Sequence, residues 1–205
     1  MYRYSDGYIR NGVQRQMIIL ASASPRRAEL FGNLGVKFEI HIPLVDEKRA
    51  AAHCAGRPAE MAETLARAKA SAVCERFPED IAVGADTVVS LDGKSFGKPV
   101  SETDAYRMLS ALSGRTHTVY TGVAVGGPRG IYSSCVKTDI LFGTLSETQI
   151  KEYIATGEPM DKAGAYAIQG AAREFVSKIS GDYFSVVGLP LGETVRLLRM
   201  QGVDI

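Results

Sequence analysis

Short apolar runs alternate with amphipathic stretches along the first half of the chain. Continuously apolar runs bounded by turn residues predict buried strands, whereas stretches with one apolar face predict helices. The predicted strands are residues 17–21, 38–42 and 81–91, and the predicted helices are residues 25–34, 58–77 and 103–112. Ser24 and Ser101 are suited to cap two of these helices, and Asp92-Gly93 is a tight-turn signal.

The second half begins with two long alternating stretches joined by a glycine-rich turn, which predicts an antiparallel pair. The predicted elements are strands over residues 119–125, 131–142 and 175–179 and helices over residues 146–155 and 191–200. Ser146 and Gln149 form a capping box at the start of the first of these helices. This order of elements indicates an α/β protein with a mixed sheet. We expect one domain over residues 17–205, after a flexible extension over residues 1–16.

The helix predicted over residues 58–77 is the longest, and its apolar side should face the sheet. At helical spacing this side carries Met61, Leu65, Ala68, Ala72 and Val73. Glu63 and Arg67, one turn apart, are expected on the opposite, solvated side.

Composition and charge limit the classes of partner. The 205 residues are 45% hydrophobic and 23% charged, with a formal net charge of +1. This balance is typical of a globular protein and gives no general attraction to nucleic acid, so phosphate binding needs a local cluster. No apolar run reaches the length of a membrane span or of a signal-peptide core. Scattered cysteines without CxxC spacing indicate free thiols, and we expect a cytoplasmic location.

A serine–arginine turn follows the first predicted strand, where residues 22–27 read Ser-Ala-Ser-Pro-Arg-Arg. Backbone amides at the start of a helix attract anions, and arginines with a serine hydroxyl add charge-assisted donors. The turn therefore predicts a phosphate site. The alternative left open is that Ser24 only caps the helix and the arginines are solvated.

An acid interrupts the most apolar predicted strand, at Gly84-Ala85-Asp86-Thr87. Such an acid is costly unless it faces a cleft or has a partner. In a cleft it could hold a divalent cation or take a proton from water. The alternative is an aspartate that closes a turn. Under the first interpretation, Asp86 and the serine–arginine turn face a common pocket.

Other polar candidates are scattered along the chain. Glu47 lies in the loop expected over residues 43–47, and Lys69 and Lys98 are single lysines of a kind that is usually solvated. The stretch 161–170 is rich in small residues and ends in Gln169-Gly170, so it could let an amide approach a base or could be a plain connection.

Two apparent motifs are set aside. Gly93-Lys94-Ser95 lacks the glycine spacing of a phosphate-binding P-loop. His117 precedes a strand, and we expect it to be a structural hydrogen bonder rather than a general base.

Taken together, these segments resemble the Maf family. The matching segments are residues 20–27, 84–89, 97–99, 113–117, 161–166 and 187–190. They lie in register over roughly residues 17–200, and six segments in order are specific where one would not be. The family is similar in fold to the inosine triphosphate pyrophosphatases, which implies a mixed, bent sheet flanked by helices and two lobes around a cleft.

The resemblance implies hydrolysis of nucleoside triphosphates to a monophosphate and pyrophosphate with Mg²⁺ or Mn²⁺. It implies that Asp86 is the catalytic acid–base residue and, with Glu47, a metal ligand. The implied phosphate-binding residues are Ser24, Arg27, Lys69 and Lys98, and those matching the branch that takes dTTP and UTP are Arg26, Thr87 and Gln169. Family members are also thought to accept modified pyrimidine nucleotides. Ala68 departs from the acid that many relatives carry, which could alter the orientation of Lys69.

Two other functions stay open at this stage. One is a related triphosphatase with a preference for inosine or 7-methylguanosine nucleotides. The other is a nucleotide-binding regulator of septum formation with little turnover. The resemblance leans toward a homodimer, and no nucleic acid or membrane partner is expected.

Overall fold

The structure is a computed structural model that describes residues 9–10, 13–14 and 16–205, with side chains from Gln16 onward. The short strands β1 (Ile9–Arg10) and β2 (Val13–Gln14) pair in antiparallel fashion. The flexible extension expected over residues 1–16 falls mostly outside the described residues and stays a prediction, as does the single domain over residues 17–205.

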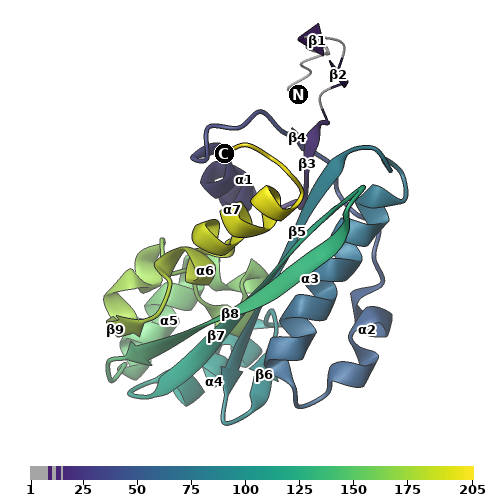
Figure 1. The fold of residues 1–205 in the computed structure, drawn as a ribbon. Coiled ribbons are helices and arrows are strands. Elements are labelled where there is room, and N and C mark those ends of the chain that lie inside the picture. The colour runs from purple at the N-terminus through teal and green to yellow at the C-terminus, as the bar shows by residue number, and fades with distance from the viewer. Residues whose placement is uncertain (1–8, 11–12, 15) are drawn as a thin grey trace.

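A mixed seven-stranded sheet forms the centre of the described part of the chain (Figure 1). Its strands are β3 (Ile18–Ala21), β4 (Glu39–Ile40), β5 (Ile81–Leu91), β6 (Lys94–Phe96), β7 (Thr116–Gly127), β8 (Gly130–Phe142) and β9 (Val176–Ser180). The order is β4-β3-β5-β7-β8-β9, with β6 paired to β5. β3 runs parallel to β4 and β5, and the other pairs are antiparallel. The predicted α/β class with a mixed sheet is therefore confirmed.

Helices flank this sheet, and most of them begin where the sequence predicts. The α-helices are α1 (Pro25–Gly32), α2 (Glu47–Ala50), α3 (Pro58–Cys74), α4 (Glu102–Leu112), α5 (Glu147–Ala155), α6 (Tyr183–Val187) and α7 (Leu191–Met200). Short 3₁₀ turns are η1 (Ala52–Cys54), η2 (Glu158–Asp161), η3 (Ala163–Ala165) and η4 (Ala171–Phe175). The side chains of Ser24, Ser101 and Ser146 each accept a backbone amide of the first turn, so these predicted caps are confirmed.

The short elements differ from the prediction. α2 lies at the end of the loop expected over residues 43–47, because the Asp46 side chain caps it. α6 was not expected, and it follows Asp182, whose carboxylate caps it. The strand expected over residues 38–42 is reduced to β4, since only these two residues pair with β3. Elements of this length have too little sequence for a periodic signal, so tertiary contacts decide them.

α3 lies very close to one face of the sheet (Figure 1). A Cβ added at Gly122 of β7 would lie 2.2 Å from the Ala62 carbonyl oxygen, and one at Gly84 of β5 would lie 2.3 Å from that of Ala66. The strands therefore place glycines against the backbone of α3, and the helix has alanines at the contact. Small residues on both sides allow this close approach.

The face of α3 predicted from hydrophobicity was partly wrong. Met61, Ala68 and Ala72 are only half-buried, whereas the buried positions are Ala62, Leu65, Ala66, Lys69, Ala70 and Val73. Hydrophobicity alone could not tell one alanine of this helix from another, whereas the glycines of β5 and β7 select the side of α3 that carries Ala62, Ala66 and Ala70. The expected solvated side is correct for Arg67, which is exposed, while Glu63 is half-buried beside Ser133.

The opposite face of the sheet carries the larger apolar core. Helices α1, α4, α5 and α7 contribute to it, and the side chains that these helices bury there are Leu30, Phe31, Leu109, Leu112, Ile150, Tyr153, Leu197 and Leu198. Valines of β5 and β7 complete this layer from the sheet side. β5 is thus buried on both faces, which agrees with its nearly continuous apolar run.

One edge of β5 is open in its middle. On this side β3 pairs with β5 up to Gly84, and β6 pairs with it only from Val89 onward. Residues 85–88 therefore have no strand partner on this side among the described residues. The opening lies at the carboxyl end of β3, the position where α/β sheets commonly bind ligands.

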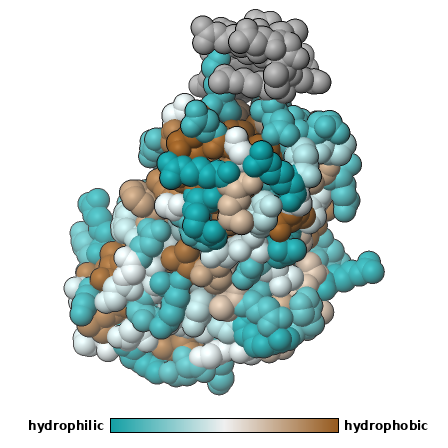
Figure 2. All heavy atoms as spheres, viewed as in Figure 1, coloured by the Kyte–Doolittle hydropathy of each residue, from teal (hydrophilic) through white to brown (hydrophobic). Residues whose placement is uncertain are grey.

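No helix in the described ranges is long and apolar enough to cross a membrane. The face shown in Figure 2 carries hydrophilic and intermediate residues over most of its area, interrupted by smaller hydrophobic patches.

Candidate active site

A cavity of about 650 Å³ lies at the open edge of β5. Every residue that the sequence nominated for the site lines it: Ser24, Arg26, Arg27, Glu47, Lys69, Asp86, Thr87, Lys98 and Gln169. Asp86 and Thr87 are neighbours on a strand, so their side chains point to opposite faces of the sheet. Both reach the same cavity because no strand of the described residues covers this edge between Gly84 and Val89. The expected common pocket is present, but it extends across both faces.

On the α3 face, one lysine joins two carboxylates. The Lys69 ammonium lies 2.6 Å from Asp86 Oδ1 and 2.8 Å from Glu47 Oε1. The side chains of Lys69 and Asp86 are only 11% and 15% exposed, and each therefore needs a charged partner. Asp86 faces α3 because it lies two residues after Gly84, on which that helix rests. Lys69 is thus a buried structural and electrostatic partner and not a solvated surface lysine.

Glu47 is held ionised by the surrounding cations. Partial burial acts to raise its pKa, but the hydrogen bond and charge of Lys69, with smaller effects of Lys98 and Arg27, outweigh burial. The pKa of Glu47 therefore lies below its usual value. This carboxylate is available to cations at neutral pH.

On the other face, Arg27 is fixed from two sides. Its Nε donates to the Gly188 carbonyl oxygen over 2.8 Å, and its Nη2 donates to Thr87 Oγ1 over 3.2 Å. Burial lowers the pKa of Arg27, and the charges of Asp86 and Glu47 oppose that effect. Arginine stays protonated in proteins even so. The cavity therefore contains a preorganised guanidinium.

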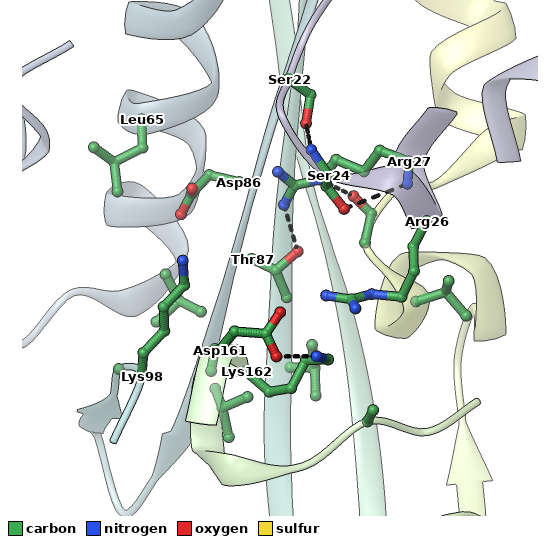
Figure 3. A pocket seen from close by; sticks show the side chains of 18 of the residues that line it. Ser22, Ser24, Arg26, Arg27, Leu65, Asp86, Thr87, Lys98, Asp161 and Lys162 are labelled. Carbon is green, nitrogen blue, oxygen red and sulfur yellow. Dashed lines mark hydrogen bonds and ion pairs between the residues drawn. The ribbon is translucent and has the colours of Figure 1, made fainter. Parts of the chain in front are cut away.

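The serine turn combines both predicted roles. Ser24 Oγ accepts the backbone amide of Arg27 over 3.5 Å, and the Ser24 amide donates to Ser22 Oγ over 3.1 Å (Figure 3). Ser24 therefore caps the helix, as the alternative interpretation expected, but Arg27 is not solvated. A hydroxyl that accepts a backbone amide still has its own proton to donate, so capping and ligand binding are compatible.

Further charged side chains enclose the cavity. Figure 3 shows Lys98 extending toward Asp86 from one side and Arg26 and Arg27 lying on the other. Asp161 and Lys162 form an ion pair and also line the cavity. Neither residue was predicted to belong to the site, because an adjacent acid–base pair is common on any surface.

Gln169 is exposed at the cavity wall. Hydrogen bonds to Glu158 hold the loop that carries it. Glu158 Oε2 accepts the Ala171 amide over 3.3 Å, and Glu158 Oε1 accepts the Tyr153 hydroxyl over 2.8 Å. A Cβ on Gly170 would lie 2.0 Å from the Glu158 carboxylate. An alanine at position 170 would therefore displace this carboxylate from its two hydrogen bonds.

His117 is buried and lies behind the cavity. Its Nε2 is 2.9 Å from the hydroxyl of Tyr166, which itself lines the cavity. Burial lowers the pKa of His117 to about 4, so the ring is neutral at pH 7. Its surroundings are those of the structural hydrogen bonder that the sequence predicts.

In the part of the chain that the structure describes, two groups of side chains could hold a metal ion. The ligand atoms of His53, Cys54 and Glu60 lie within 4.8 Å of one another, but none of these residues lines the cavity. Glu47 and Asp86, by contrast, face the cavity and already converge on one cation, the Lys69 ammonium. Their oxygens are the ligands that Mg²⁺ and Mn²⁺ prefer, so this pair fits a divalent cation better.

Known proteins resemble this chain over nearly its whole length. The model of the family described as Maf-like protein matches residues 17–201. The dTTP/UTP pyrophosphatases of Symbiobacterium thermophilum and Moorella thermoacetica are each 50% identical, over 93% and 92% of this chain and 96% of each relative. The dTTP/UTP pyrophosphatase of Acinetobacter baylyi is 47% identical over 88% of this chain and 97% of its own.

Among solved structures, a nucleoside-triphosphatase described as a dITP/XTP pyrophosphatase from Mycobacterium abscessus superposes with a TM-score of 0.40 at 14% identity. It covers 63% of this chain and 76% of its own, which is too partial a likeness to bear on the site. The match to the family model spans nearly the whole chain and includes every element that lines the cavity. The chain therefore belongs to the Maf family.

Proposed function

We propose that this chain hydrolyses nucleoside triphosphates to a monophosphate and pyrophosphate, with dTTP and UTP as favoured substrates. The observation that carries the proposal is the division of one cavity into a cationic wall and a carboxylate pair. Arg26, Arg27 and Lys98 are matched to a polyanion, and Glu47 with Asp86 to a cation and water. The relatives named dTTP/UTP pyrophosphatase support the choice of base.

The cationic residues would hold the triphosphate. Arg27 is fixed by two hydrogen bonds before a ligand arrives, so little side-chain entropy is lost on binding. Lys98 would face the phosphates from the opposite wall. Ser24 and the backbone amides at the start of α1 add neutral donors. Charges that are positioned in advance also stabilise the negative charge that develops on the leaving pyrophosphate.

Asp86 would orient and deprotonate the attacking water. Water attacks the α-phosphorus, the bond to the oxygen that bridges the α- and β-phosphates breaks, and pyrophosphate leaves. Asp86 accepts a hydrogen bond from this water, orients it and receives its proton. Lys69 would hold Asp86 in position through the ion pair of 2.6 Å.

Glu47 and Asp86 would also hold a divalent cation, Mg²⁺ or Mn²⁺. When bound, such a cation neutralises negative charge on the phosphate oxygens. Both carboxylates line the cavity beside the residues proposed to hold the phosphates, which supports this placement.

The outer end of the cavity would recognise the base. Gln169 presents an amide that both donates and accepts, as the edge of a pyrimidine requires. Arg26 and Thr87 also line the cavity and would contribute to this preference. If Gln169→Ala leaves the relative rates on dTTP, UTP, CTP and GTP unchanged, this assignment is wrong.

A panel of triphosphates with Mg²⁺ tests the whole proposal. The panel holds dTTP, UTP, CTP, GTP, ITP and 7-methyl-GTP, and both products are identified by ion-exchange chromatography. We expect fastest turnover of dTTP and UTP, with pyrophosphate and the monophosphate as products. Release of single phosphates, or preference for ITP or 7-methyl-GTP, contradicts the proposal. Nucleotide binding without turnover would instead support a regulator.

A further inference from the structure

A line of hydroxyl groups runs from Arg27 away from the cavity to α6. Arg27 Nη2 lies 3.2 Å from Thr87 Oγ1, which lies 3.1 Å from Thr121 Oγ1. Thr121 Oγ1 in turn lies 2.7 Å from the Ser185 carbonyl oxygen. Thr87 and Thr121 are direct partners on β5 and β7, so the register of the sheet sets this spacing.

The two ends of the line determine the direction of every hydrogen bond in it. A guanidinium can only donate, and a carbonyl oxygen can only accept. Thr121 must therefore donate its proton to Ser185, and Thr87 must donate its proton to Thr121. The Thr87 oxygen then has its lone pairs free to accept from Arg27. A chain of this kind holds each member in a single orientation and polarises its neighbours.

α6 is itself anchored at the far end of the line. Thr138 accepts the Asp182 amide over 3.0 Å, and the Ser185 hydroxyl donates to the Asp182 carbonyl over 2.7 Å. At the other end of α6, Gly188 presents its carbonyl to Arg27 at a φ of +129°, which favours glycine. A Cβ there would also lie 3.4 Å from Arg27 Nε. Two carbonyls of one short segment thus orient the guanidinium, one directly and one through the threonines.

We propose that Thr121 is a positioning residue for Arg27. Thr121 is fully buried and does not line the cavity, so its effect on a substrate passes through Thr87 and Arg27. A guanidinium has five N–H groups, and two are used by Gly188 and Thr87. Within the described part of the chain, the other three are left for a ligand. Their direction depends on the orientation that Thr121 maintains. The inference rests on the proposed function in one respect, that Arg27 grips a triphosphate.

Thr121→Val tests the inference because it keeps the shape and removes the hydroxyl. Without that group Thr87 loses the acceptor for its proton, so its hydroxyl can rotate and no longer holds Arg27 in one orientation. We expect kcat/KM for dTTP to fall on the order of ten- to a hundred-fold, the scale of a misplaced binding group. Thr121→Ser keeps the donor and should retain activity within a few-fold.

Thr194→Val is the matched control. Thr194 is also fully buried, and its hydroxyl donates to the Pro190 carbonyl over 2.8 Å without any link to Arg27. Both valine variants should lower the melting temperature, but only Thr121→Val should lower kcat/KM. If the two variants lose stability alike and both keep full activity, Thr121 is only structural and the proposal fails. If Thr121→Val does not fold, Thr121→Ala and Thr194→Ala give the same comparison.

Two further measurements separate this proposal from the proposed function. Binding of the α,β-methylene analogue of dTTP, which cannot be cleaved between its α- and β-phosphates, is measured by calorimetry for each variant. Weaker binding by Thr121→Val alone supports the positioning role even if wild type shows no turnover. Thr87→Val and Thr121→Val should also combine to less than the product of their separate effects, since both break one line. Fully multiplicative effects would overturn it.

Discussion

Lys69 shows how one residue can be misjudged from its surroundings in sequence. A lysine on an amphipathic helix is usually solvated, yet this one is buried and bridges Glu47 and Asp86. Two carboxylates so close would repel each other, and the ammonium makes their approach favourable. The same bridge holds Asp86 in place at the edge of the cavity, where the proposed chemistry needs a carboxylate.

Asp86→Asn tests the role of this carboxylate. The amide has nearly the same shape but cannot accept a proton, so turnover of dTTP should fall by roughly two orders of magnitude or more. Steady-state kinetics with dTTP and Mg²⁺ measure the kcat of the variant and of wild type. Asp139→Asn, which removes a carboxylate outside the cavity, should stay near wild type. A folded Asp86→Asn variant with near-normal kcat would refute the acid–base role.

At the scale of elements, the sequence predicted the features that depend on interactions between residues close together in the chain. Serine caps, the Asp92-Gly93 turn and the apolar run of β5 depend on residues within one turn or one strand, and each was found. The face of α3 depends instead on its contacts with Gly84 and Gly122 in the sheet. No local sequence feature of these strand glycines predicts that they pack against the helix. α6 likewise exists because of its cap and its contacts with β7 and β8.

Gly122→Ala tests the close packing of α3. Its Cβ would lie 2.2 Å from a backbone oxygen, which neither element can move aside easily. We expect a loss of unfolding free energy of about 1–3 kcal/mol, the scale of overpacking, measured by urea denaturation. Gly192→Ala has open space around it in α7 and should raise stability slightly. Equal stability of Gly122→Ala and wild type would show that α3 does not sit this closely.

At the scale of the whole molecule, the site depends on an interruption in the sheet. The residues that line the cavity could be nominated from sequence, because their motifs are specific and lie in order. The geometry could not, because the gap between β3 and β6 along β5 comes from strand pairing over long sequence distances. Thr121 could not be found either, since a threonine in a long strand has no local feature that distinguishes it.

The buried ring of His117 predicts an acid-sensitive fold. Its pKa is lowered to about 4 in the folded chain, so between pH 6.5 and 4 the unfolded chain binds a proton that the folded chain does not. Stability is therefore lost as the pH falls through this window, by up to about 1.4 kcal/mol per pH unit from this residue. Glu47 also contributes stability that is lost on acidification, but at lower pH, since its pKa lies below the usual value of a glutamate.

Urea unfolding at pH 7, 6 and 5 measures this dependence for wild type and His117→Gln. The variant lacks the titrating ring and should show the shallower slope. Parallel slopes would mean that His117 is protonated in the folded chain as readily as in the unfolded one.

The position of a bound nucleotide is the most direct measurement of the site. Crystals of the chain with Mg²⁺ and the α,β-methylene analogue of dTTP should show the triphosphate between Arg27 and Lys98, with the α-phosphorus nearest Asp86. A nucleotide bound outside the cavity, or one whose phosphates point to solvent while its base approaches Asp86, would contradict this arrangement.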